Sequence, residues 1–182
     1  MKTTITCLAI IAMALMALPA SAATIITVDN DAPGASYIGY WTTSTHDDGY
    51  IGLDYRVRAA GTAGDTFTWT PDITEPGEYE VYAWWTASSN RSSNATFTVY
   101  HDDDASPVVK DQKTQGCSWV LLGVFDFDGV NDYVELAQSP TGYVIADAVR
   151  WVKVESVPIP GAAWLLGCGF VSLLGLRKKL RD

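Results

Sequence analysis

Cysteine is scarce in this chain of 182 residues, which has only three. Cys7 and Cys168 lie in apolar stretches near the two ends, and Cys117 is the only cysteine between them. The central region therefore cannot form an internal disulfide and must be stabilised by its own apolar core or by a disulfide between chains. We expect Cys117 to be an unpaired, buried thiol.

Basic residues are scarce as well. The chain has 12 Lys and Arg against 21 Asp and Glu, and residues 24–156 contain seven basic and twenty acidic residues, a net charge near −13. A surface this acidic repels phosphate backbones, so we expect no nucleic-acid partner. Acidity of this kind suits an exported soluble protein, or one that holds divalent cations.

Motifs for catalysis are missing. The sequence has no nucleophile elbow, no phosphate-binding loop and no carboxylate pair placed by a recognisable motif. Residues 46–48 and 101–104 combine His with Asp, but two such segments are more typical of solvated turns than of a metal site. The oxygen-bearing residues between Asp126 and Asp132 lack calcium-loop spacing and indicate a tight hairpin turn. We expect no enzyme activity, no cofactor and no metal.

The N-terminal end is that of a secretory signal peptide. Lys2 precedes an apolar run over residues 7–18, and small residues follow. Cleavage is expected after Ala22, with Ala20 and Ala22 as the small residues that define the site. The expected organisation is a signal peptide at 1–22, a folded domain at 23–156 and a C-terminal segment at 157–182.

The C-terminal end has three parts in a fixed order. A proline motif is followed by an apolar run over residues 162–176 and by a basic cluster at 177–179. The motif consists of Val157, Pro158, Ile159, Pro160 and Gly161. In a bilayer the apolar run must be helical, and at 1.5 Å per residue it reaches roughly 22 Å, less than the ~30 Å hydrocarbon layer. This favours a hydrophobic helix that enters the membrane and is later processed.

This segment resembles the C-terminal sorting signals of the PEP-CTERM type, in the variant that reads Val-Pro-x-Pro-Gly/Ala. The resemblance implies processing by an exosortase-type membrane enzyme in a Gram-negative cell that makes extracellular polysaccharide. It also implies an inner-membrane intermediate that is held by the C-terminal helix and then released to the cell surface or the medium. The alternative is a plain anchor that is retained.

The central region is predicted to be all-β. Apolar and polar residues alternate with period two in short runs separated by turn residues, and no long run has helical period. Nine or ten strands at this spacing indicate a single antiparallel two-sheet β-sandwich, jelly-roll-like. The expected strands cover 24–28, 39–45, 50–58, 66–70, 78–86, 95–101, 108–112, 119–127, 132–138 and 143–154.

The strand over residues 78–86 shows how its faces divide. Tyr79, Val81, Ala83 and Trp85 point to the core, while Glu80, Tyr82, Trp84 and Thr86 point outward.

Two further strands can be assigned in the same way. In residues 119–127 the alternation places Trp119, Leu121 and the following odd-numbered residues on the face opposite Asp126. Residues 143–154 form one central strand, in which Asp147 and Arg150 are candidates for a partly buried ion pair.

Aromatic blocks throughout the central region resemble the golvesin C-terminal-like domain. The blocks are Asp29-Asn30-Asp31, Gly39-Tyr40-Trp41-Thr42, Gly49-Tyr50-Ile51-Gly52, Thr68-Trp69-Thr70-Pro71, Gly77-Glu78-Tyr79-Glu80-Val81-Tyr82-Ala83-Trp84-Trp85, Ser89-Asn90-Arg91, Trp119-Val120-Leu121-Leu122-Gly123 and Gly142-Tyr143-Val144-Ile145-Ala146-Asp147-Ala148-Val149-Arg150-Trp151. The resemblance implies a β-sandwich module of the kind attached to xanthan lyases, with a carbohydrate-binding-like accessory role. Residues 115–118 depart from the family pattern.

Exposed aromatic rings bind sugars by stacking on their C–H faces, and polar groups around them recognise the hydroxyls. The residues that we expect to bind carbohydrate are Tyr82, Trp84, Trp41, Trp119 and Arg91, with Tyr50 as a further aromatic. Arg91 follows the strand of Tyr82 and Trp84 and is placed to pair with an acidic sugar. The alternative for each ring is a place in the core.

Two functions remain open. The first is an exported, non-catalytic module that binds extracellular polysaccharide at the bacterial surface. The second is a structural or adhesive matrix protein that acts through protein–protein contacts and binds no sugar.

Overall fold

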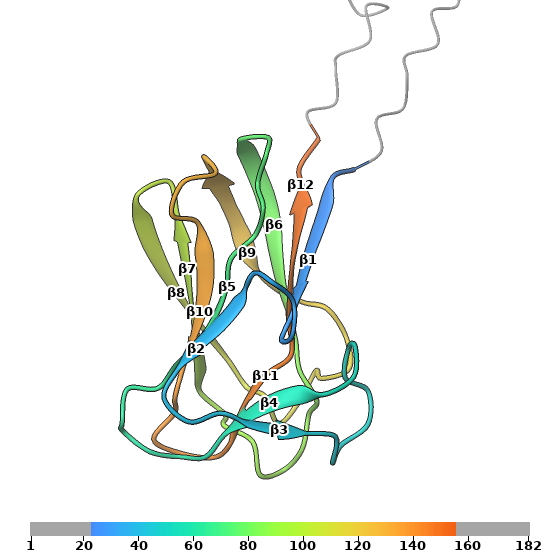
Figure 1. Ribbon diagram of the computed structural model, residues 1–182, viewed down its shortest axis with the longest axis vertical. Helices are drawn as coiled ribbons and strands as arrows, with labels where there is room; N and C mark the ends of the chain where they lie inside the picture. Colours follow the sequence, from blue (N-terminus) through green and yellow to red (C-terminus); the bar gives the residue numbers. More distant parts are fainter. Residues whose placement is uncertain (1–22, 156–182) are drawn as a thin grey trace, which may run out of the picture.

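Two β-sheets pack face to face, and a smaller third sheet covers one end of them (Figure 1). The computed structural model describes residues 23–155. The predicted signal peptide with Ala20 and Ala22, the motif from Val157 to Gly161 and the apolar run after it lie outside the described residues. Within residues 23–155 there is no helix long and apolar enough to cross a membrane.

Short strands of three to eight residues make up the described part of the chain. They are β1 (Ile25–Asp29), β2 (Ala35–Ile38), β3 (Thr42–Ser44), β4 (Tyr55–Arg58), β5 (Thr66–Trp69), β6 (Gly77–Trp84), β7 (Ala95–His101), β8 (Asp104–Lys110), β9 (Val120–Phe127), β10 (Tyr133–Ala137), β11 (Val144–Ala146) and β12 (Ala148–Lys153).

Sheet A has the strand order β1-β12-β6-β9, sheet B has β2-β5-β10-β7-β8, and sheet C has β11-β4-β3. Every pairing between these strands is antiparallel. The predicted all-β sandwich is therefore confirmed. Sheet C is an addition that the sequence did not indicate, because its strands have only three or four residues each.

The core lies between sheets A and B and is rich in aromatic rings. Phe67 and Trp69 of β5 have ring centroids 4.8 Å apart, and Phe97 of β7 lies 6.4 Å from Trp69 and 6.1 Å from Trp85. Each of these side chains is at most 1 % exposed. Burying one large apolar side chain contributes about 1.5–3 kcal/mol, so this aromatic cluster stabilises the contact between the sheets without a disulfide.

Strand β6 divides as the sequence predicts. Tyr79, Val81, Ala83 and Trp85 are fully buried, while Tyr82 and Trp84 are half-buried on the outer face of sheet A. The prediction was wrong for Thr86, which is fully buried, because β6 ends at Trp84 and the alternation does not continue past it.

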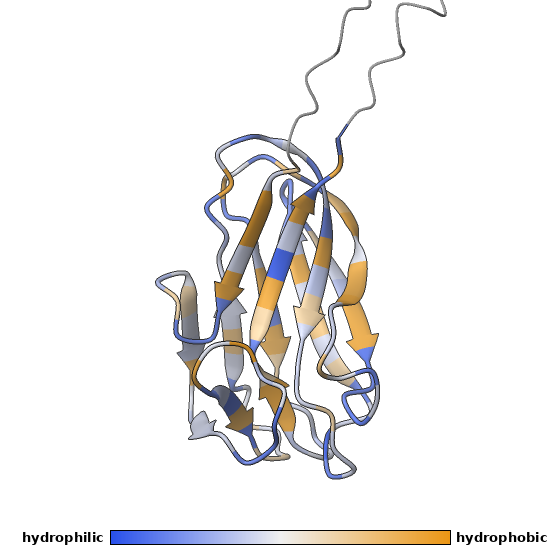
Figure 2. Cartoon of the chain, turned by 90° about the vertical axis from the view of Figure 1, so that its right-hand side faces the viewer, coloured by the Kyte–Doolittle hydropathy of each residue, from blue (hydrophilic) through white to orange (hydrophobic). Residues whose placement is uncertain are grey.

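Strand β9 does not follow simple alternation, because a β-bulge interrupts it. Val81 of β6 pairs with Gly123, but the next residue, Tyr82, pairs with Leu121, so Leu122 is the extra residue. Leu122 is consequently buried, whereas Leu121 points outward and is exposed. The predicted single alternation over residues 119–127 was wrong for this reason. Figure 2 faces this side of the molecule and shows apolar segments along the strands of sheet A.

The predicted single strand over residues 143–154 is broken at Asp147. The part before it, β11, belongs to sheet C, and the part after it, β12, belongs to sheet A. The carboxylate of Asp147 accepts the Ile51 N–H at 3.2 and 3.3 Å, and its backbone carbonyl accepts the Trp69 Nε1–H at 3.3 Å. One buried residue thereby joins a loop, sheet B and the crossing between the other two sheets.

The expected ion pair between Asp147 and Arg150 is absent from the described residues. Asp147 is 1 % exposed, while Arg150 points outward, donates from Nε to Thr27 Oγ1 at 3.2 Å and places its guanidinium 3.9 Å from the ring centroid of Trp119. Arg150 lies on the outward face of β12, whereas Asp147 precedes this strand and its carboxylate binds the Ile51 N–H.

Gln112 holds sheet C against the body of the molecule. Its side chain is fully buried, and its amide group donates to the Ile145 carbonyl and accepts from the Ile145 N–H, both at 2.8 Å. Gln112 thus takes the place of a neighbouring strand beside β11. The sequence predicted Gln112 within a strand, but β8 ends at Lys110.

Replacing Gln112 with leucine should therefore be costly. The change leaves both buried polar groups of Ile145 without partners, and we expect the free energy of unfolding to fall by about 2–4 kcal/mol. Urea denaturation of the purified protein measures this change. Gln138 is the matched control, because it makes the same paired contact with the Ala63 N–H and the Ala59 carbonyl at 2.9 Å, but at an exposed site. Equal losses for Gln112→Leu and Gln138→Leu would contradict the account.

Stability should also depend on pH through Asp147. Burial, and secondarily the nearby charges of Asp29 and Asp54, raises the pKa of Asp147 to about 8, although the hydrogen bond from Ile51 lowers it. Between pH 4 and pH 8 the folded state therefore holds a proton that the unfolded chain releases, so stability falls as pH rises, by at most about 1.4 kcal/mol per pH unit. Asp147→Asn should flatten this slope in urea denaturation between pH 5 and pH 8. The exposed Asp72→Asn should keep it, and parallel curves for Asp147→Asn and the parent protein would refute the assignment.

Candidate functional site

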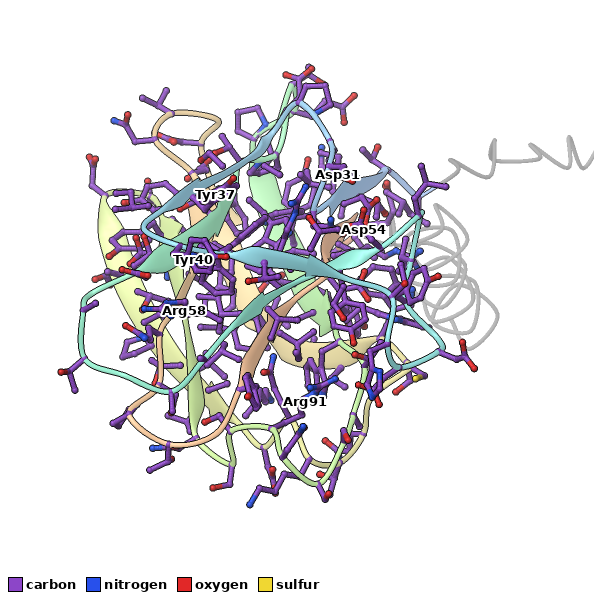
Figure 3. The ribbon with its side chains drawn as sticks, turned by 60° about the horizontal axis from the view of Figure 1, so that its bottom comes forward. Asp31, Tyr37, Tyr40, Asp54, Arg58 and Arg91 are labelled. Carbon is purple, nitrogen blue, oxygen red and sulfur yellow. The ribbon has the colours of Figure 1, made fainter. Side chains whose placement is uncertain are left out.

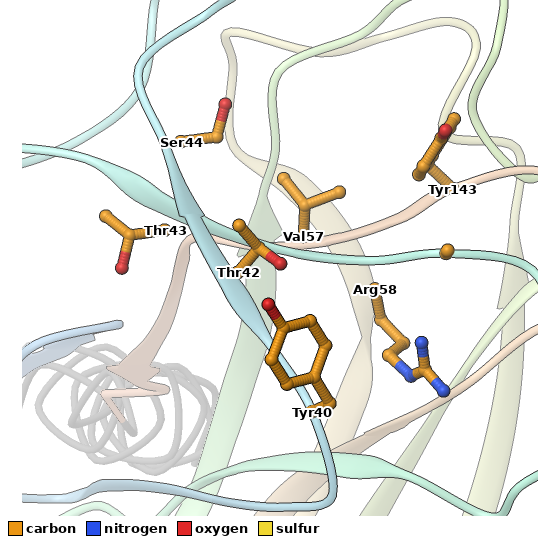
Figure 4. Close-up of a pocket in the computed structure, with 8 residues that line it drawn as sticks. Tyr40, Thr42, Thr43, Ser44, Val57, Arg58 and Tyr143 are labelled. Atoms are coloured by element: carbon orange, nitrogen blue, oxygen red, sulfur yellow. The ribbon is translucent and has the colours of Figure 1, made fainter.

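A hollow of about 270 Å³ opens on sheet C (Figure 4). Strands β3 and β4 form its floor, and Tyr40 and Tyr143 lie on either side of it. It is lined by Tyr40, Thr42, Thr43, Ser44, Val57, Arg58, Ala59 and Tyr143. The lining combines two aromatic rings, three hydroxyl side chains and one cation.

The two tyrosines come from the segments that flank sheet C. Tyr40 lies between β2 and β3, and Tyr143 directly precedes β11. Tyr40 is 72 % exposed and Tyr143 is 42 % exposed, so both rings are open to a ligand. Strand β3 is the outer strand of its sheet and β4 pairs with it through Thr42 and Val57, which places the hydroxyls beside the rings.

Asp65 supports the hollow from beneath. Its side chain is nearly buried, Oδ2 accepts the Tyr40 N–H at 2.9 Å, and the same oxygen lies 2.6 Å from Arg58 Nε. Gly39 has φ +86°, and a Cβ there would lie 2.0 Å from the Asp65 carboxyl carbon, so only glycine lets the carboxylate approach. One carboxylate therefore positions both Tyr40 and Arg58, which lie near one another in Figure 3.

Arg58 gives the hollow its charge. It is the only charged residue in the lining, although the domain as a whole is strongly acidic. Within residues 23–155 its two Nη groups have no hydrogen-bond partner, since its one ion pair uses Nε. A guanidinium with free Nη groups binds carboxylates in two-point geometry.

Arg91 does not face a ligand, contrary to the expectation from sequence. It is 4 % exposed, donates from Nε to the Thr86 carbonyl at 3.2 Å and forms an ion pair with Asp47. Its guanidinium also lies 5.8 Å from the ring centroid of Tyr55. Burial and these internal partners use its hydrogen-bonding capacity, and Figure 3 shows it set apart from Tyr40 and Arg58.

The same arginine nevertheless shapes the hollow. The segment of Arg91 bridges to Tyr143: the Tyr143 N–H donates to the Asn90 carbonyl at 3.0 Å, and the Ser92 N–H donates to the Tyr143 carbonyl at 2.7 Å. Asp47, its ion-pair partner, lies in the loop that follows β3. Arg91 therefore fixes the two segments on either side of the hollow relative to each other.

Trp41 is a second residue that was expected to bind carbohydrate but is buried. It is 5 % exposed and meets Phe67 edge-on, with ring centroids 5.4 Å apart. The exposed ring belongs to the preceding residue, Tyr40. Tyr40 and Trp41 lie in an irregular segment between β2 and β3, where the alternation of strands does not apply, so no local pattern distinguishes the exposed ring from the buried one.

Three of the expected aromatics gather on the outer face of sheet A. Trp84 and Trp119 meet edge to face with centroids 5.2 Å apart, and Arg150 covers a face of Trp119. Trp84 Nε1 donates to the Gly49 carbonyl at 2.8 Å, and the Tyr82 hydroxyl donates to Glu80 at 2.7 Å. The two tryptophan rings contact each other, and carbohydrate binding by Tyr82, Trp84 and Trp119 stays a prediction. Tyr50 packs beside Tyr55, with ring centroids 5.8 Å apart.

Two other expectations need correction. Cys117 is an exposed free thiol and not a buried one. Residues 128–132 form a tight turn, in which Asp128 accepts the Val130 N–H and Asp132 accepts the Gly129 N–H. The turn is not the predicted hairpin, because it connects β9 in sheet A to β10 in sheet B. Across residues 23–155 no group of three or more His, Cys, Asp or Glu is arranged to hold a metal ion.

The fold and the hollow define a β-sandwich module with an aromatic, cation-bearing surface site. The model of the golvesin C-terminal domain matches residues 26–153, and the chain belongs to this family.

Known proteins share this module. Xanthan lyase from Bacillus sp. (strain GL1) is 35 % identical over 136 residues, which cover 71 % of this chain and 15 % of the enzyme. The structure of Paenibacillus xanthan lyase matches with a TM-score of 0.69 and 34 % identity over 72 % of this chain and 13 % of that one. The Podospora anserina GH26-CBM35 β-(1,4)-mannanase matches with a TM-score of 0.55 at 16 % identity, over 74 % of this chain and 29 % of that one, and shares the fold. The chain thus spans a small part of each of these proteins.

Proposed function

We propose that this chain is an exported, non-catalytic module that binds extracellular polysaccharide through the hollow on sheet C. The observation that carries the proposal is the pair of exposed rings, Tyr40 and Tyr143, on either side of hydroxyl groups and the guanidinium of Arg58, which pairs with Asp65 through Nε and leaves its Nη groups without a partner among the described residues. Sugar rings stack on such tyrosines, and the hydroxyls of Thr42 and Ser44 exchange hydrogen bonds with those of the sugar.

Arg58 points to the kind of sugar. Its Nη groups are free to pair with a carboxylate, so a polysaccharide that carries acidic residues fits the hollow better than a neutral one. The names of the related lyases agree with a polysaccharide ligand. Their reaction is not assigned to this chain, because the chain covers only 15 % and 13 % of the length of these enzymes.

The position of the hollow suits a surface protein. The described chain ends lie together at one end of the molecule, and sheet C lies at the other (Figure 1). A chain held at the membrane by its C-terminal segment would present the hollow to the outside. We propose that residues 1–22 direct export, and that an exosortase-type enzyme processes the chain near the motif from Val157 to Gly161 before the folded domain, residues 23–156, reaches the cell surface or the medium.

One observation favours the structural or adhesive alternative. On the outer face of sheet A, Ile25 is 56 % exposed and Val124 is 44 % exposed, and they belong to one row that also contains Val152 and Glu80. With Leu121 in the next row, the aliphatic residues of this row expose apolar surface, interrupted by Glu80, that is available for protein–protein contacts.

Variants of the hollow test the binding function. We expect Tyr40→Ala and Tyr143→Ala each to weaken binding of an acidic polysaccharide about tenfold, or about 1.4 kcal/mol, because each removes a stacking surface. Calorimetry with oligogalacturonate measures the change. Arg58→Gln should lose this ligand, and its thermal stability should fall as well, because the change leaves the nearly buried carboxylate of Asp65 without its ion-pair partner. Trp84→Ala is the comparison on sheet A.

The outcomes separate the alternatives. Loss of binding in Trp84→Ala but not in the two tyrosine variants would move the site to the outer face of sheet A. No binding of any glycan in an array, with self-association that Val124→Lys abolishes, would establish the adhesive alternative instead.

Processing has its own test. If the proline motif directs cleavage, the mature protein from its native host should end close to Pro160, because the apolar run is then removed with the basic tail. Mass spectrometry of the surface protein determines this terminus. Recovery of the intact terminus at Asp182 would show that the segment is a retained anchor.

A further inference from the structure

A second hollow, of about 390 Å³, lies at the other end of the molecule from sheet C. It forms on sheet B, near the turn between β7 and β8 and the turn between β9 and β10, and both turns are at the top of Figure 1. Neither the expected binding residues nor the hollow on sheet C includes any part of it.

Two tyrosines form one wall of this hollow. Tyr100 of β7 and Tyr133 of β10 are directly opposite one another in the ladder. Their rings stack with centroids 4.2 Å apart and an angle of 19°. The stack holds both rings in place, so they form a preorganised aromatic surface. Burial raises the pKa of Tyr133.

The hollow exists because the third residue of this row is small. Ala105 of β8 pairs with Tyr100, so the row across the three strands reads tyrosine, tyrosine, alanine. Because the side chain of Ala105 is only a methyl group, a recess remains beside the rings. Ala105 is exposed, so the recess opens to solvent.

The rim carries oxygen acceptors in fixed positions. Asp103 and Asn131 have φ values of 60° and 57°, and Asp104 begins β8 at the same end. Short Asp and Asn side chains are the residues that accept this left-handed conformation in tight turns, so both turns are set locally. Neither Lys nor Arg lines this hollow. Its charge is therefore opposite to that of the hollow on sheet C.

We propose that this second hollow is an independent sugar-binding site for neutral or amino sugars. A sugar ring stacks on the outer surface of the tyrosine pair, and the carboxylates of Asp103 and Asp104 accept its hydroxyl or ammonium protons. The same carboxylates repel uronic acids. With sites of opposite charge preference at its two ends, one molecule bridges two polysaccharide strands, or two kinds of sugar within one matrix.

The test is a nuclear magnetic resonance titration of the isotope-labelled protein with three probes: cellohexaose, a chitosan oligomer and oligogalacturonate. We expect cellohexaose and the chitosan oligomer, but not oligogalacturonate, to shift the amide signals of Ala105 and Asn131. Tyr133→Ala should weaken this binding about tenfold. Ala105→Phe fills the recess and leaves both tyrosines in place, so it should do the same even if Tyr133→Ala unfolds.

The controls separate this inference from the function proposed for sheet C. Tyr37 is a half-exposed tyrosine on β2, at the opposite edge of sheet B, and Tyr37→Ala should change nothing at Ala105. Tyr40→Ala should also leave these signals unaffected. If no probe moves the signals, if only oligogalacturonate does, or if Ala105→Phe has no effect on them, the second site is refuted. Signals near Tyr40 that still respond to oligogalacturonate would then leave the first function intact.

Discussion

The architecture depends on the interruption at Asp147, which separates strand β11 from strand β12. This residue ends β11 in sheet C and starts the crossing to β12 in sheet A, and its own groups bind the loop at Ile51 and the indole of Trp69 in sheet B. A continuous strand would extend sheet A past the sandwich and leave β4 paired with β3 alone. Because the chain turns here, a third sheet covers the end of the sandwich and carries the hollow.

Buried polar side chains make this small sheet rigid. Gln112 supplies the hydrogen bonds of a missing strand to β11, Arg91 joins the loops on both sides of the hollow, and Asp65 holds Tyr40 and Arg58. Sheet C has too few residues to bury a core of its own. Specific hydrogen bonds therefore position its exposed aromatic rings, and a rigid, preorganised surface binds with a smaller entropic cost.

The sequence was sufficient for the sandwich but not for the site. Period-two alternation identified β6 and its buried face, and β7 was placed with its observed bounds. It did not reveal the bulge at Leu122 or the break at Asp147, since both arise from pairing with distant strands. The burial of Arg91 depends on its ion pair with Asp47, 44 residues away. Which of Tyr40 and Trp41 is exposed depends on where the irregular segment that contains them crosses sheet B, since Trp41 packs on Phe67 there. Such long-range contacts leave no local pattern.

A crystal structure with a bound acidic oligosaccharide tests the central claim most directly. The account places a sugar ring in van der Waals contact with Tyr40 or Tyr143 and a carboxylate at the Nη groups of Arg58. A ligand bound elsewhere, with the hollow on sheet C free, would contradict it.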